Sequence, residues 1–150
     1  MRRKKLIVLA PLLLLCLSGA AVAQGRPGHL RSWAGKYPTN KRGRVTTSFF
    51  SLPEIRTPLL RLLSRTDFRL LTKEYEVQTP IKQIDDYLAL KVCRAHSCDE
   101  EGGGLAINLR TGVIYVRMQD GEKVRWFASK GDATTLSREV KDYLDDFSTT

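Results

Sequence analysis

The sequence predicts an α+β fold, in which a single antiparallel β-sheet of about five strands is flanked by helices. Short apolar runs follow one another between residues 81 and 127, and their connections are too short for parallel crossovers. A leucine-rich segment containing a proline precedes these runs. A stripe of apolar residues at helical spacing follows them, and it needs a sheet to cover.

The first helix is expected at residues 57–65, because Thr57 suits the N-cap and Pro58 the first helical position. Three leucines would share its buried face: Leu59, Leu60 and Leu63. A second apolar group fits either a short helix or irregular packing: Phe68, Leu70 and Leu71.

The strands are expected in five segments: 81–84, 87–92, 105–109, 113–118 and 123–127. The turn at 110–112 contains a glycine, and Asp120-Gly121 is a strong hairpin signal. The closing helix is predicted from an apolar stripe with charged residues outside it: Leu136, Val140, Tyr143, Leu144 and Phe147.

Residues 1–23 have the pattern of a secretory signal peptide. A basic head at 2–5 precedes an apolar core at 6–17, and small residues at 21–23 form a cleavage site. The apolar run is shorter than the roughly 20 residues of a membrane span, so no transmembrane anchor is expected. We therefore predict an exported protein beginning at Gln24.

Residues 24–44 form a basic segment, expected to be a flexible or loosely docked leader before a domain at 45–150. The segment has six basic residues and no acid, whereas residues 45–150 have 15 basic and 16 acidic residues. Trp33 and Tyr37 would suit stacking on nucleic acid or docking on anionic lipid, but a solvated leader is favoured and no nucleic-acid partner is expected. His29 is assigned no role.

The candidate site is the segment Cys93-Arg94-Ala95-His96-Ser97-Cys98. Cys93 and Cys98 are the only cysteines left after the signal is removed, and export predicts a disulfide between them. The ring would either direct His96 or be a structural staple with an incidental histidine. The segment that follows, with Asp99, Glu100, Glu101 and three glycines, reads as an acidic, flexible stem.

Other chemistry fits this segment less well. A zinc site from Cys93, His96 and Cys98 lacks a nearby fourth ligand and would be abolished by oxidation. The spacing of the cysteines differs from that of thiol oxidoreductases, and Ser97 beside His96 is not evidence of a catalytic triad. We therefore expect neither an enzyme nor a cofactor, and no metal.

The segment from Cys93 to Cys98 resembles the Cys-Lys-Pro-His-Asp-Cys loop of the Ivy family, the periplasmic inhibitors of vertebrate lysozyme. The similarity covers roughly residues 55–131, including the strand at 87–92 and the hairpin at 105–118. It implies a protruding loop that plugs the active-site cleft of c-type lysozyme, with His96 on the catalytic carboxylates. Arg94 would then add a cationic contact, and the acidic residues at 99–101 would steer toward a basic muramidase.

Three residues differ from the family loop: Arg94 stands for Lys, Ala95 for Pro and Ser97 for Asp. These changes point to an endogenous lytic transglycosylase as a second target besides c-type lysozyme. The resemblance also implies a periplasmic location in a Gram-negative envelope and allows a homodimer. The rival interpretation is a noninhibitory envelope-binding module attached through its basic tail.

Overall fold

The computed structural model describes residues 27–42 and 45–147. Six strands form the main sheet: β3 (Val77–Gln78), β4 (Lys82–Ile84), β5 (Tyr87–Cys93), β6 (Glu101–Asn108), β7 (Ile114–Asp120) and β8 (Lys123–Ala128). Three α-helices accompany it: α1 (Pro53–Leu62), α2 (Arg65–Arg69) and α3 (Arg138–Asp145). The order is β3-β5-β6-β7-β8, β4 also pairs with β5, and every pair is antiparallel. The predicted α+β class is confirmed.

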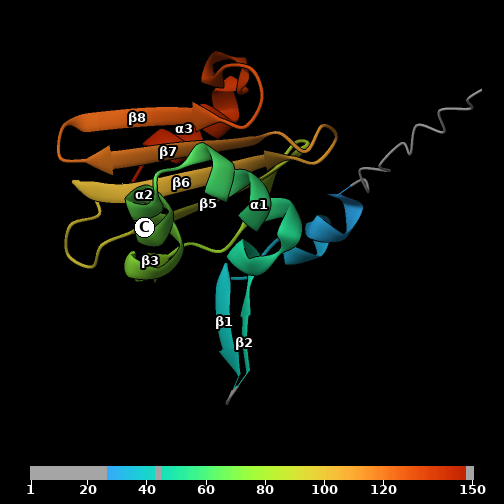
Figure 1. Ribbon diagram of the computed structural model, residues 1–150, viewed down its shortest axis with the longest axis horizontal. Coiled ribbons are helices and arrows are strands. Elements are labelled where there is room, and N and C mark those ends of the chain that lie inside the picture. Colours follow the sequence, from blue (N-terminus) through green and yellow to red (C-terminus); the bar gives the residue numbers. More distant parts are fainter. Residues whose placement is uncertain (1–26, 43–44, 148–150) are drawn as a thin grey trace, which may run out of the picture.

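The sheet is covered on both faces, by α1 and α2 on one and by α3 on the other (Figure 1). Alternation along the strands divides the core accordingly. On β5, Leu88, Leu90 and Val92 face the cluster that contains α1 and α2, whereas Ala89 belongs to the cluster that contains α3. The predicted C-terminal stripe packs on this second face, where Val140 and Leu144 are fully buried. Its helix spans only Arg138–Asp145, after a 3₁₀ turn, η4 (Ala133–Thr135).

The first helix begins earlier than the sequence pattern predicted. Pro53, not Pro58, occupies the first turn, and Pro58 lies inside the helix. Ile55 and Leu59 are both fully buried, and burying this i, i+4 pair requires the helix to include residue 55. The same register turns Leu60 outward, where it is 51% exposed, so its expected place on the buried face was wrong.

The chain after α1 resolves the choice left open at residues 68–71. Ser64 caps α2 by accepting a hydrogen bond from the Asp67 amide, and the helix continues into a π-helical turn, η3 (Leu70–Glu74). Phe68 and Leu71 are buried in the core. A short helix followed by a wider turn is therefore the observed arrangement.

The described part of the basic segment forms regular structure and reaches the core, whereas its composition favours a flexible or loosely docked leader. Residues of η1 (Pro27–Trp33) enter the core, since Leu30 is fully buried and Trp33 packs edge-on against Phe49. A two-stranded hairpin of β1 (Thr39–Arg42) and β2 (Val45–Ser48) follows and projects from the body (Figure 1). Another turn, η2 (Phe49–Ser51), leads into α1. The predicted signal peptide lies outside the described residues.

The three glycines after the loop form part of β6 and not a flexible stem. A Cβ at Gly102 would lie 2.6 Å from Phe147, and one at Gly104 would lie 2.9 Å from Leu144. On the other face, a Cβ at Gly103 would lie 2.8 Å from Leu71. These glycines therefore allow side chains from both layers to approach the strand closely. Close packing, and not a turn, explains why glycine occupies these three positions.

We expect Gly104→Ala to lower the free energy of unfolding by about 1–3 kcal/mol, because the Leu144 side chain must shift and is fully buried in a packed core. Urea unfolding measures the change. Gly28→Ala is the matched control: nothing lies within 4 Å of its added Cβ, so it should stay within about 0.5 kcal/mol of wild type. Equal stability of the two variants would contradict the close packing of α3 on β6.

Candidate functional site

The candidate loop connects β5 to β6 at one end of the sheet. The last residues paired across these strands are Cys93 and Gly102, and the Arg94 amide donates to the Glu101 carbonyl at 3.0 Å. The turn between β7 and β8 lies at the same end (Figure 1), where the Gly121 amide donates to the Glu100 carbonyl at 2.9 Å. The loop is thus anchored on two strands and on the neighbouring hairpin.

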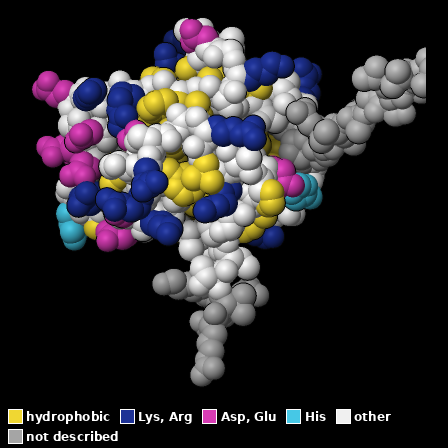
Figure 2. All heavy atoms as spheres, in the orientation of Figure 1, with side chains coloured by type: hydrophobic (Ala, Val, Ile, Leu, Met, Phe, Trp, Pro, Cys, Tyr) yellow, Lys and Arg dark blue, Asp and Glu magenta, His cyan; other side chains and the backbone are white. Residues whose placement is uncertain are grey.

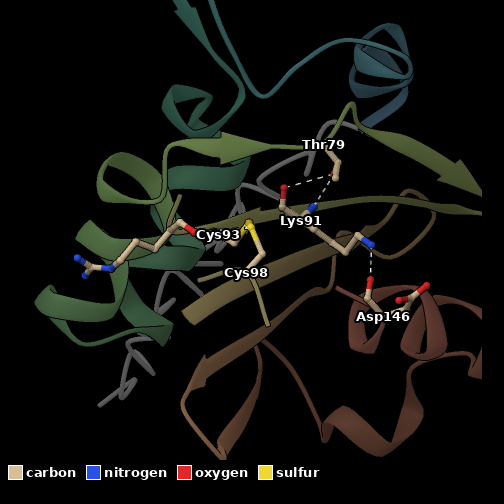
Figure 3. The surroundings of a disulfide bond; sticks show 6 residues. Thr79, Lys91, Cys93, Cys98 and Asp146 are labelled. Atoms are coloured by element: carbon tan, nitrogen blue, oxygen red, sulfur yellow. Dashed lines mark hydrogen bonds between the residues drawn. A yellow bond between two sulfur atoms is a disulfide. The ribbon is translucent and has the colours of Figure 1, made fainter. Parts of the chain in front are cut away.

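Cys93 and Cys98 are disulfide-bonded, as predicted, with their Cα atoms 4.9 Å apart (Figure 3). Cys93 is fully buried at the end of β5, so the bond ties the loop to the rigid sheet. Because both sulfurs are used in this bond, neither is a thiolate that could bind zinc. Among the described residues, no group of three His, Cys, Asp or Glu side chains could hold a metal ion.

His96 lies at the far side of this ring and is exposed to solvent. Its backbone is left-handed, with φ at +65°, a conformation that few residues other than glycine adopt, although histidine is enriched there. The Ser97 amide donates to the Arg94 carbonyl at 3.1 Å and closes this turn. The loop therefore presents the imidazole outward from a tightly turned backbone.

Arg94 and Glu101 form an ion pair across the base of the loop, with Arg94 Nε 2.6 Å from Glu101 Oε2. The two acidic neighbours Asp99 and Glu100 are exposed. Figure 2 shows acidic side chains gathered along the edge of the molecule where the β5–β6 loop lies. Of the three acids expected to steer a partner, Glu101 is thus largely balanced by Arg94, whereas the two exposed acids contribute to an acidic edge.

A hollow of about 300 Å³ lies beside the loop base, between α2 and the sheet, and sequence reasoning missed it. Arg94 and Glu101 line it together with Asp67, Tyr75 and Arg125. Arg125 binds Asp67 through two hydrogen bonds, of 2.9 and 2.6 Å, and these lower the pKa of the Asp67 carboxyl. Burial raises the pKa of Tyr75. No local signal in the sequence marks this pair, because Asp67 lies in a largely polar stretch and its partner is 58 residues away.

Lys91 is a second feature that sequence reasoning missed. It is 1% exposed, although it lies two residues before Cys93 in an otherwise apolar strand. Its ammonium donates to the Asp146 carbonyl (Figure 3) and lies 4.8 Å from the centre of the Tyr143 ring. Burial lowers the pKa of Lys91. The residue therefore fastens the end of α3 to β5 close to the disulfide.

The fold and the loop define a small α+β protein that presents a disulfide-closed loop at one end of an antiparallel sheet. A protein-family model, described as inhibitor of vertebrate lysozyme (Ivy), matches residues 54–150. The chain therefore belongs to the Ivy family, which is a family of lysozyme inhibitors. The match includes α3, so the resemblance extends beyond the range 55–131 seen in the sequence.

Neither the curated proteins nor the solved structures contain a significant match to the chain. Within residues 27–42 and 45–147, no helix has the length and apolar character that crossing a membrane requires.

We expect Arg125→Met to lower the free energy of unfolding by about 1–3 kcal/mol at pH 7, because it leaves the Asp67 carboxylate, 5% exposed, without its main donor. A carboxyl whose pKa is lowered in the folded state stabilises the protein above its unfolded pKa of about 3.9, and this contribution is lost as the pH falls through the folded value. The difference from wild type should therefore shrink in urea unfolding at pH 3.

Arg110→Met is the control for this prediction, because Arg110 is 75% exposed and its contact with Asp86 is 3.5 Å long. We expect it to have little effect at either pH. An Arg125→Met difference that is the same at pH 7 and pH 3 would show that the Asp67 charge is not involved.

Proposed function

We propose that this chain inhibits lysozyme-type peptidoglycan hydrolases by inserting the loop 93–98 into the active-site cleft, with His96 as the contacting residue. Membership of the Ivy family supports inhibition of lysozyme in general. The observation that supports the loop mechanism is the exposure of His96 at the tip of a ring whose base, Cys93, is fully buried.

The chemistry of the target suits an imidazole. Glycosidases use two carboxyl groups, which lie about 5–5.5 Å apart in retaining enzymes and about 6.5–9.5 Å apart in inverting ones. A protonated imidazole donates from both ring nitrogens, and two hydrogen bonds of about 2.8 Å let one ring bridge the shorter of these gaps. His96 would therefore occupy the position of the scissile bond.

The rigidity of the loop would favour tight binding. A segment already held in its bound shape loses little conformational entropy on association. The disulfide, the Arg94–Glu101 ion pair and the hydrogen bond from Gly121 all restrict the loop before any target arrives. The exposed Asp99 and Glu100 would accelerate the encounter with a basic muramidase.

Two target enzymes remain in the proposal, namely c-type lysozyme and an endogenous lytic transglycosylase. Ala95 and Ser97 differ from the family's Pro and Asp, and they flank His96 directly. The proposed location is the periplasm, which rests on the family and on the predicted signal peptide. Inhibition of each purified enzyme on cell-wall substrate identifies the target, and inhibition of neither would overturn the proposal.

We expect His96→Ala to raise the inhibition constant against the responding enzyme at least tenfold, because it removes the imidazole. His96→Asn should have a similar effect, and asparagine also tolerates the left-handed backbone at this position. His29→Ala is the matched control, since His29 is the only other histidine and contacts Glu54. Wild-type inhibition by both His96 variants would exclude the proposed mechanism.

We expect the double variant Cys93→Ala, Cys98→Ala to inhibit more weakly than wild type, because the opened loop must be ordered on binding. Loss of so small a ring lowers the free energy of unfolding by about 2 kcal/mol in the loop-entropy model. Inhibition is measured at a temperature where circular dichroism shows the variant folded. Full inhibition by the folded variant would mean that the disulfide is only a structural staple.

A further inference from the structure

The second half of the loop rests on a side chain outside it. Gln119, near the end of β7, donates from Nε2 to the Asp99 carbonyl at 2.7 Å and to the Gly121 carbonyl at 3.2 Å. The backbone of the same hairpin contributes the bond from the Gly121 amide to the Glu100 carbonyl. Residues 99 and 100 are thereby attached to the β7–β8 turn, 20 residues further along the chain.

Gln119 is itself held by a buried arginine. Its Oε1 accepts from Arg117 Nη2 at 2.8 Å, and Arg117 Nε donates to Asp145 Oδ1 of α3 at 2.7 Å. Arg117 is 5% exposed, and its guanidinium lies 5.0 Å from the centre of the Phe147 ring. A continuous set of polar contacts therefore runs from α3 through β7 to the loop.

The chemistry of these contacts requires an amide at position 119. The guanidinium of Arg117 only donates hydrogen bonds, so it needs an acceptor, while the Asp99 carbonyl only accepts and needs a donor. A glutamine provides both groups on one side chain. A glutamate would keep the contact with Arg117 and lose the donor to Asp99, so the two functions of Gln119 can be separated by substitution.

The disulfide does not attach residues 99 and 100 to the β7–β8 turn. It closes the ring between residues 93 and 98, but the bond ends before Asp99, where the chain must still return to β6. Within the loop, the Ser97 carbonyl accepts from the Glu100 amide at 3.0 Å and from the Glu101 amide at 2.7 Å. The contacts to Gln119 and Gly121 are what join residues 99 and 100 to the neighbouring β7–β8 turn.

We propose that Gln119 is the positioning residue of the target-binding loop, held by Arg117 and Asp145 and acting on the Asp99 carbonyl. This inference rests on the proposed inhibitory function. Gln119 need not touch the target. It reduces the motion of the loop in the unbound protein, and it makes the loop dependent on α3, which is distant in sequence.

The experiment compares Gln119→Glu and Gln119→Ala with matched variants of Gln83, which also donates to a backbone carbonyl but lies on β4, paired with the opposite end of β5. Three properties are measured on the full mature chain, namely the inhibition constant, the melting temperature and the hydrogen exchange of the Gly121 amide. We expect Gln119→Glu to raise the inhibition constant about five- to tenfold and to accelerate Gly121 exchange, with the melting temperature preserved by the Arg117 contact.

Gln119→Ala should show the same two loop effects without an added charge, although loss of the acceptor for buried Arg117 also lowers its melting temperature. Gln83→Glu and Gln83→Ala should leave inhibition and Gly121 exchange at wild-type values. Equal weakening by Gln83→Glu would assign the effect to charge and overturn the inference.

The inference and the proposed function fail in different ways. Wild-type inhibition and exchange in both Gln119 variants, with weak inhibition by His96→Asn, would overturn the positioning role and leave the loop mechanism in place. Wild-type inhibition by both His96→Ala and His96→Asn would overturn the loop mechanism, and the positioning role with it.

Discussion

The structure depends on the close approach of two layers to β6. At Gly102 and Gly104, Phe147 and Leu144 occupy the space that a Cβ would fill, and Leu71 does the same at Gly103 from the opposite face. The strand is therefore enclosed by helical segments on both sides at the point where the loop returns to the sheet. A methyl group at Gly102 or Gly104 would force the side chain of Phe147 or Leu144 to shift at this end of the sheet.

This packing explains the buried charges near the loop. Because α3 lies close to the sheet, its C-terminal residues reach the polar side chains of β5 and β7. Asp145 receives a hydrogen bond from Arg117, and the Asp146 carbonyl receives one from Lys91. Buried polar groups of this kind stabilise a fold only when they are hydrogen-bonded, so these contacts favour the observed position of α3 on the sheet.

The same arrangement gives the loop a rigid base with an exposed tip. Cys93 is buried and bonded to Cys98, whereas His96 is exposed on a left-handed backbone. Members of the Ivy family are lysozyme inhibitors, and a braced loop that presents one imidazole suits a cleft lined by two carboxylates. In the proposed mechanism, the acidic edge around the loop (Figure 2) would add complementarity to a basic enzyme.

The sequence by itself determined the features that depend on local chemistry. Short apolar runs placed β4 to β8 but neither β3 nor the β1–β2 hairpin, Asp120-Gly121 marked a hairpin, and the cysteine pair identified the disulfide ring and its histidine. The sequence pattern predicted that α1 starts at Pro58, because proline suits the first turn of a helix. Pro53 suits that turn equally well, and only the burial of Ile55 shows that the helix begins there. The glycines at 102–104 suggested a flexible stem, because the side chains that pack against them come from segments distant in the sequence.

Only the tertiary structure decided which polar residues act together. Asp67 and Arg125, or Gln119 and the Asp99 carbonyl, are far apart in the chain and carry no common motif. Their pairing follows from strand order and from the packing of α2 and α3 on the sheet. Leu30 likewise joins the core although it lies in a segment whose composition is typical of a solvated tail. Composition describes average solvation, whereas the burial of a single side chain depends on the surface it meets.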